Sequence, residues 1–151
     1  MTDSHPDFHL IRVTRPDHLA MAKHLRRRIF VEEQAIPAEL DADGYDHHSM
    51  HVLVFADEEP VATGRWREAP ETWADLSRIA VAPEFRGHGL GTLVVEGLLA
   101  WAEDAGMRRA WLEPHAHLES FYNKLGFERV GDDTVVAGYR LLRMERQLDN
   151  P

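Results

Sequence analysis

At its centre the chain reads Leu76-Ser77-Arg78-Ile79-Ala80-Val81-Ala82-Pro83-Glu84-Phe85-Arg86-Gly87-His88-Gly89-Leu90-Gly91-Thr92. The first part belongs to a strand predicted over residues 73–81, where apolar residues alternate, and the last part opens an amphipathic helix. The turn between them places glycine at every second position. Glycines let a ligand approach the main chain closely, and the first turn of a helix offers unpaired N–H groups and the positive end of its dipole. The turn therefore predicts an anion site suited to phosphate, with Arg86 at its rim.

Two familiar phosphate-binding motifs do not fit this turn. A P-loop requires lysine before its serine or threonine, and Gly91 stands before Thr92. A dinucleotide-binding fold requires a different glycine spacing near the first strand and an acidic residue about 20 positions later, where this chain has Trp111. The turn is therefore a phosphate site of a third kind, and the alternative is a tight turn that binds no ligand.

Working outward from the turn, strands and helices alternate in an order typical of α/β proteins. A first strand is followed by a helix that starts near Thr14-Arg15-Pro16-Asp17, and then by an irregular acidic stretch over residues 35–48. Further strands are expected at 51–56, 61–66, 109–113, 127–130 and 139–146, with a short helix at 118–125. Hairpins mixed with strand–helix–strand crossovers predict an α/β sheet that is partly antiparallel.

Composition excludes several classes of protein. The 151 residues suit one domain, and they contain no cysteine for disulfide or thiol chemistry. A formal net charge of −9 repels phosphate backbones, so we expect no nucleic-acid partner. No apolar run approaches the roughly 18 residues of a membrane span, and the first ten residues lack the pattern of a signal peptide. We therefore expect a cytoplasmic protein with no membrane partner.

The central motif resembles that of the GNAT superfamily of acyl-CoA N-acyltransferases. Its pattern Arg/Gln-x-x-Gly-x-Gly/Ala is matched by Arg86, Gly89 and Gly91. About thirty residues on, Phe121-Tyr122-Asn123-Lys124-Leu125-Gly126-Phe127 is similar to a second signature of the family, Tyr-x-x-Leu-Gly-Phe. The N-terminal half is most like the ElaA-like branch, through Arg26-Arg27-Arg28-Ile29-Phe30-Val31-Glu32-Glu33-Gln34, Asp43-Gly44-Tyr45-Asp46 and His51.

The resemblance implies a single GNAT domain over residues 1–151, with a mixed, mostly antiparallel sheet flanked by helices. It also implies an N-acetyltransferase that moves an acetyl group from acetyl-CoA, as co-substrate, to a primary amine by direct attack. The expected acceptor is a small-molecule amine, with a peptide amine as the alternative, and the expected state is a monomer or homodimer. Two other functions share the fold: acyl-homoserine-lactone synthesis from S-adenosylmethionine, and non-catalytic sensing of acyl-CoA.

The resemblance assigns the binding of acyl-CoA to two segments. The strand residues Ile79, Ala80 and Val81 match a bulge whose main-chain amides serve the pantetheine arm and the thioester oxygen. The pyrophosphate is assigned to Arg86, Gly87, His88, Gly89, Leu90, Gly91 and Thr92. Tyr122 matches the tyrosine that protonates the departing thiolate, and a phenol is mostly protonated at neutral pH. The alternative for Tyr122 is an aromatic wall that transfers no proton.

The attacking amine must lose a proton, so a base is needed. Glu113 is the first candidate, because it ends a predicted strand beside the cofactor in the resembled fold. Glu33 is the second, and it is expected on the acceptor side with Arg26, seven residues earlier on the same helical face, and with Phe30. For both glutamates the alternative is a structural ion pair.

Metal binding is not expected. His115 and His117 alternate on a strand end, but a closed zinc site has four ligands and this chain has no cysteine. The acidic run Asp41-x-Asp43-Gly44-x-Asp46 departs from a calcium loop because its glycine comes too early.

Overall fold

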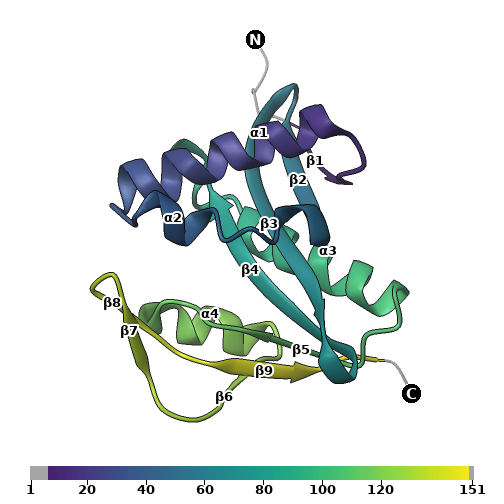
Figure 1. Ribbon diagram of the computed structural model, residues 1–151. Helices are drawn as coiled ribbons and strands as arrows, with labels where there is room; N and C mark the ends of the chain where they lie inside the picture. Colours follow the sequence, from purple (N-terminus) through teal and green to yellow (C-terminus); the bar gives the residue numbers. More distant parts are fainter. Residues whose placement is uncertain (1–6, 150–151) are drawn as a thin grey trace.

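A seven-stranded sheet forms the centre of the computed structural model, which describes residues 7–149 (Figure 1). Its strands follow the order β1-β2-β3-β4-β5-β9-β6. Only β4 and β5 run parallel, and every other neighbouring pair is antiparallel. The sheet is therefore mixed and mostly antiparallel, as predicted. The strand bounds are β1 Phe8–Arg12, β2 Met50–Ala56, β3 Glu59–Ala69, β4 Trp73–Val81, β5 Arg109–Leu112, β6 Glu128–Arg129 and β9 Met144–Gln147.

Helices cover both faces of this sheet (Figure 1). Helix α1 (Pro16–Arg26) lies across one face and continues without a break into a π-helical segment, η1 (Arg27–Glu33). Helix α3 (Leu90–Asp104) packs on the other face. The short helices α2 (Ala38–Asp41) and α4 (Glu119–Lys124) complete the layers. Four 3₁₀ turns connect these elements within the described residues: η2 Asp46–His48, η3 Pro70–Thr72, η4 Pro83–Phe85 and η5 Ala116–Leu118.

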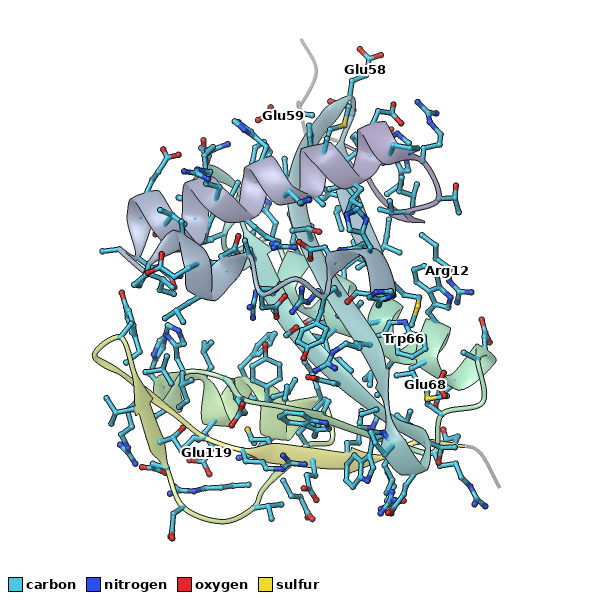
Figure 2. All side chains as sticks on the ribbon, in the orientation of Figure 1. Arg12, Glu58, Glu59, Trp66, Glu68 and Glu119 are labelled. Carbon is cyan, nitrogen blue, oxygen red and sulfur yellow. The ribbon has the colours of Figure 1, made fainter. Side chains whose placement is uncertain are left out.

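The main core lies between the sheet and α3. Val94 and Leu98 from the helix are fully buried, as is Trp66 from β3. Figure 2 shows Trp66 inside the molecule, whereas Glu58 extends outward at the tip of the hairpin between β2 and β3. A smaller core on the opposite face joins Leu25 and Ile29 of the first helix to Ala80 and Ala82.

Strands β4 and β5 stay together for only a short distance. Their pairing covers Trp73–Asp75 against Arg109–Trp111, and beyond these residues the two strands diverge (Figure 1). Past Asp75, β4 therefore has a free edge on the side of β5. The divergence divides the sheet into an N-terminal and a C-terminal part, and it creates the space for a site.

The structure differs from the sequence prediction in several elements. The stretch expected to be irregular contains the short helix α2, β3 is longer than predicted, and the strand β7 (Thr134–Val136) was not predicted. The predicted last strand is divided into β8 (Tyr139–Leu141) and β9, and β8 pairs with β7 in a separate hairpin. The two turn residues Ala137 and Gly138 both have positive φ, of 52° and 82°, which suits a tight hairpin. Helix α1 begins after Arg15 rather than Thr14, and no side chain caps it.

The sequence predicted neither a signal peptide nor a membrane-spanning segment. Part of the N-terminal stretch that was compared with signal peptides, residues 1–6, lies outside the described residues. Within residues 7–149, no helix has the length and apolar character needed to cross a membrane.

Candidate active site

A bulge interrupts β4 where it leaves β5. Across β3, Thr63 pairs with Ala80 and Arg65 pairs with Ser77, so Arg78 and Ile79 together oppose the single residue Gly64. Arg78 adopts a positive φ of 58°, which re-aims the strand. The resemblance implied a bulge at Ile79, Ala80 and Val81. The structure has one at Arg78 and Ile79, whereas Ala80 and Val81 pair regularly with Thr63 and Ala62.

A cavity of about 610 Å³ opens beside this bulge, between the diverging strands. Its walls come from η1, β4, the start of α3, the end of β5, α4 and the β7–β8 hairpin. The predicted residues that line it are Phe30, Ile79, Ala80, Val81, Arg86, Gly91, Glu113 and Tyr122. The structure thus brings the β4 edge, the end of the glycine turn and both predicted catalytic residues to one cavity.

The glycine turn has the geometry of an anion cradle. Gly87 and Gly89 have positive φ values of 85° and 76°, and Gly89 is the N-cap residue of α3 without a side-chain cap. A Cβ atom built at either glycine would meet no atom within 4 Å, so the surface above the turn is open. Among the described residues, no hydrogen bond is donated by the main-chain N–H groups of residues 87–89. These groups and the α3 N-terminus fit a pyrophosphate.

The Arg86 side chain does not point into the turn. Its guanidinium forms two parallel hydrogen bonds with Glu33, at 2.7 and 2.8 Å, and its Nε donates to the Val81 carbonyl at 3.2 Å. The hydrogen bonds from Arg86 hold the pKa of the Glu33 carboxyl below its usual value. The prediction that Glu33 lies with Arg26 on the acceptor side is therefore wrong. Glu33 instead joins the end of η1 to the glycine turn. In a π-helix each turn contains more residues than in an α-helix, so Glu33 does not share the helical face of Arg26.

The prediction that Arg26 contacts the acceptor is also wrong. This side chain is 1% exposed and forms ion pairs with Asp41 at 3.2 Å and Asp46 at 2.7 Å. Arg65 pairs with the same Asp46 at 2.8 Å. The acidic stretch after the first helix folds back over Arg26, and a charged group at this depth needs such partners. Arg26 therefore ties the acidic stretch to the first helix.

Burial and charge act in opposite directions on the ionisation of this cluster. Burial opposes ionisation of Asp46, but hydrogen bonds from Arg26 and Arg65 outweigh it and hold the pKa of Asp46 well below its usual range. Burial lowers the pKa of His51, whose Nε2 lies 3.0 Å from the Asp46 carbonyl oxygen. At neutral pH the cluster is therefore an ionised network of aspartates and arginines beside an uncharged histidine.

Sequence reasoning missed Arg78. From the β4 bulge it donates to the carbonyls of Leu40 and Asp41, at 2.6 and 3.1 Å, and it also pairs with Asp43. It thereby fixes α2 above the bulge at one end of the cavity. In the sequence, Arg78 interrupts the apolar alternation of the strand, which could have marked it as unusual. Its partners lie more than 30 residues earlier in the chain, so the neighbouring sequence did not identify them.

Tyr122 lies on α4 with 4% of its surface exposed, edge-on to Phe121 and Phe127 at ring centroid distances of 4.9 and 6.0 Å. Burial raises the pKa of its phenol well above the ordinary value, so the hydroxyl keeps its proton at physiological pH. Glu113 lines the same cavity from the end of β5, and its side chain is exposed. Both residues are in reach of the cavity, as predicted.

Two further rings in the cavity were considered in the sequence only as metal ligands. The ring of His115 lies against that of Tyr139, with centroids 4.6 Å apart and a tilt of 32° between the planes, and the His117 ring centroid lies 5.7 Å from that of His115. The Tyr139 hydroxyl donates to the Gln34 carbonyl at 2.7 Å and so connects the β7–β8 hairpin to η1. Over residues 7–149, no three histidine, aspartate or glutamate side chains gather in a metal-binding arrangement.

Comparison with solved structures identifies the fold. A crystal structure of an acyl-CoA N-acyltransferase from Pseudomonas aeruginosa is similar with a TM-score of 0.82 and 24% identity, over 93% of this chain and 99% of that one. Escherichia coli ElaA gives a TM-score of 0.82 and 24% identity, over 94% and 99% of the two chains. At this identity the likeness shows the acyl-CoA N-acyltransferase fold.

The sequence comparison is more specific. The model of the Acetyltransferase (GNAT) family matches residues 19–127, and the chain therefore belongs to this family and is a transferase enzyme. YjcF of Bacillus subtilis (strain 168), described as an uncharacterized N-acetyltransferase, is 33% identical over 129 residues, which cover 85% of this chain and 91% of that protein. YyaT of the same organism is 30% identical, over 91% and 94% of the two chains. Enzymes of this family generally use acyl-CoA.

Proposed function

We propose that this protein transfers an acetyl group from acetyl-CoA to a primary amine of a small molecule. The observation that carries the proposal is that the free β4 edge, the end of the open glycine turn and Tyr122 all border one cavity. A phosphate-binding turn, unpaired main-chain groups and a proton donor are the three parts that such a transfer needs at one place.

The glycine turn would hold the pyrophosphate of the co-substrate, and Ile79, Ala80 and Val81 would hold its arm and thioester oxygen. The thioester supplies an activated acyl group that an uncharged amine can attack. Preorganised main-chain N–H groups aimed at the oxygen that gains negative charge contribute about 3 kcal/mol to such a reaction. The buried Tyr122 hydroxyl remains protonated and can donate to the sulfur that departs.

The acceptor would occupy the cavity between η1 and the end of β5. Its walls there are mostly aromatic and aliphatic, with Phe30, Ile36 and Trp111 among them. Glu113 places a carboxylate at this end, which favours a cationic amine. Its role in taking the proton of the amine stays a prediction.

The first experiment measures binding and turnover separately. Acetyl-CoA is expected to raise the melting temperature with the logarithm of its concentration. A panel of small primary amines and short peptides is then tested for release of free CoA thiol, with the acetylated product identified by mass spectrometry. Binding without turnover on the whole panel would favour an acyl-CoA sensor, and turnover that requires S-adenosylmethionine would favour the lactone-synthase alternative.

A further inference from the structure

We propose that His115 accepts the proton that the acceptor amine loses before it attacks, an inference that rests on the proposed function. His115 lines the same cavity as Tyr122 and the β4 residues Ile79–Val81. Its side chain is partly buried. It is therefore a titratable group inside the cavity for which the structure otherwise shows no task.

The backbone and the ring of His115 are both held in place. Its carbonyl accepts a hydrogen bond from the Leu118 N–H at 2.9 Å, and the residue forms a β-bridge with Leu141 of β8. Its ring lies on Tyr139, which is itself fixed by the 2.7 Å bond from its hydroxyl to the Gln34 carbonyl. A base must be positioned before it can act efficiently, and this arrangement positions the imidazole without using its nitrogens.

The ring nitrogens of His115 have no hydrogen-bond partner within residues 7–149, so they are available to a ligand. Burial, together with the neighbouring His117, lowers the pKa of the His115 imidazole. The ring is therefore uncharged at pH 7 and can take a proton. The titratable groups around it are His117 on the same segment, Glu113 at the end of β5, Tyr139 on β8, and Asp41 with its partner Arg78 across the cavity.

The rival candidates are less suitable for this step. Glu33 is paired with Arg86 through two hydrogen bonds and does not line the cavity. Glu113 lines it, but its carboxylate is exposed. A general base works best when its pKa lies near the working pH, and the ordinary pKa of imidazole is closer to neutral pH than that of a carboxylate.

The protons and bonds balance as follows. The ammonium of the acceptor gives one proton to a ring nitrogen of His115, and the uncharged amine forms a bond to the acyl carbon while the carbon–sulfur bond breaks. The sulfur takes a proton from Tyr122, and the second proton of the attacking nitrogen returns to the Tyr122 oxygen. His115 then releases its proton to solvent, so ammonium and thioester give amide, thiol and one proton.

The test compares pH profiles of kcat/KM for one amine that the wild type acetylates, measured as thiol release from pH 5.5 to 9.5. His115→Gln should lower kcat at pH 7 by about 10²-fold, and it should remove the acidic limb that belongs to an imidazole while leaving the limb of the amine. His117→Gln, the matched control on the same segment, should keep both limbs, with the imidazole limb moved to a higher pH because His117 no longer lowers the pKa of His115. Added imidazole should restore part of the activity of His115→Ala, which a merely structural loss would not allow.

Two results would overturn the inference. One is a His115→Gln enzyme with an unchanged kcat and profile; if Glu113→Gln then lost the acidic limb, Glu113 would be the base. The other is a His115→Ala enzyme that still binds acetyl-CoA but is not rescued by imidazole at any concentration. A wild type that binds acetyl-CoA and acetylates no amine would instead contradict the proposed function, and this inference with it.

Discussion

Gly89 combines two properties at a single residue. It adopts a positive φ of 76° as the N-cap of α3, and the space above it is open. Gly106, at the other end of the same helix, also has a positive φ, of 89°, and nothing within 4 Å of a Cβ. The two glycines therefore share the same backbone requirement and differ in their distance from the cavity.

This pair separates strain from binding. Gly89→Ala and Gly106→Ala should each lower the free energy of unfolding by about 1–2 kcal/mol, because alanine is disfavoured at positive φ. Only Gly89→Ala should also weaken acetyl-CoA, since its methyl group enters the space proposed for the pyrophosphate. Urea unfolding and the melting-temperature shift with acetyl-CoA measure the two effects. An undiminished shift in Gly89→Ala would place the pyrophosphate elsewhere.

Tyr122 provides a prediction about chemistry. Tyr122→Phe keeps the buried ring and its contacts with Phe121 and Phe127 but removes the hydroxyl. Turnover should fall by about 10²-fold, and acetyl-CoA affinity should be nearly unchanged. Single-turnover measurements of thiol release check this directly. A chemical step of normal rate would make Tyr122 a wall of the cavity only.

The sequence predicted the place of a residue correctly only where its partners are close to it along the chain. Gly89 and Tyr122 stand in short motifs whose geometry is local, so the open glycine turn and the place of Tyr122 beside the cavity could be predicted. Arg26 and Glu33 could not, because their partners Asp46 and Arg86 lie 20 and 53 residues away. An arginine at helical spacing looks the same whether it faces a ligand or a buried carboxylate.

At the scale of the elements, the β4 bulge depends on a close approach by α3. A Cβ built on Gly64, the residue opposite the bulge, would lie 2.6 Å from Val94 Cγ1 and 3.0 Å from Leu98 Cδ1. A Cβ built on Gly97 of α3 would lie 2.6 Å from Leu10 Cδ1 on β1. The same added methyl group can thus disturb α3 either at the bulge or away from it.

Gly64→Ala should therefore destabilise the fold and also distort the bulge. We expect a loss of about 1–3 kcal/mol from overpacking in either variant. Both variants are compared at a temperature at which they are folded. There Gly64→Ala should bind acetyl-CoA more weakly than the wild type, whereas Gly97→Ala should bind it equally well. Calorimetric titration with acetyl-CoA provides the comparison. Equal affinities would mean that the bulge tolerates a shift of α3.

The elements were predicted unevenly from the sequence. The alternation in β4 and the helical spacing in α3 are long and regular, so their positions were correct within about one residue. The C-terminal strands are short and interrupted at Leu142 and Arg143, so the pattern merged β8 with β9. The π-helical form of η1 is not indicated by any periodicity in the sequence.

On the scale of the whole molecule, the buried charge cluster should control stability against acid. Asp46 has a depressed pKa in the folded protein, so its contribution is present above the unfolded value, about 3.9, and is lost as the pH falls through the folded one. His51 is held uncharged by burial, so the unfolded chain gains a proton first as the pH falls below about 6.5. Both groups favour unfolding at low pH.

The variant Asp46→Asn tests this directly. It should lower the free energy of unfolding at pH 7 by about 3 kcal/mol, because the buried Arg26 and Arg65 lose the carboxylate with which both of them pair. The difference from wild type should shrink as the pH falls through the folded pKa of Asp46, where the wild-type carboxyl is protonated too. Urea denaturation at a series of pH values measures both trends, and a difference independent of pH would mean that shape rather than charge is responsible.

The divergence of β4 from β5 also bears on aggregation. A strand with unpaired main-chain groups is ordinarily a template on which another chain can add a strand. Here the free edge of β4 faces a cavity whose opposite walls are η1 and the β7–β8 hairpin, joined by the bond from Tyr139 to Gln34. A small ligand with an extended arm can reach this edge, but a foreign β-strand would have to break that connection first. The fold thus keeps an interior sheet edge available for binding without offering it to other proteins.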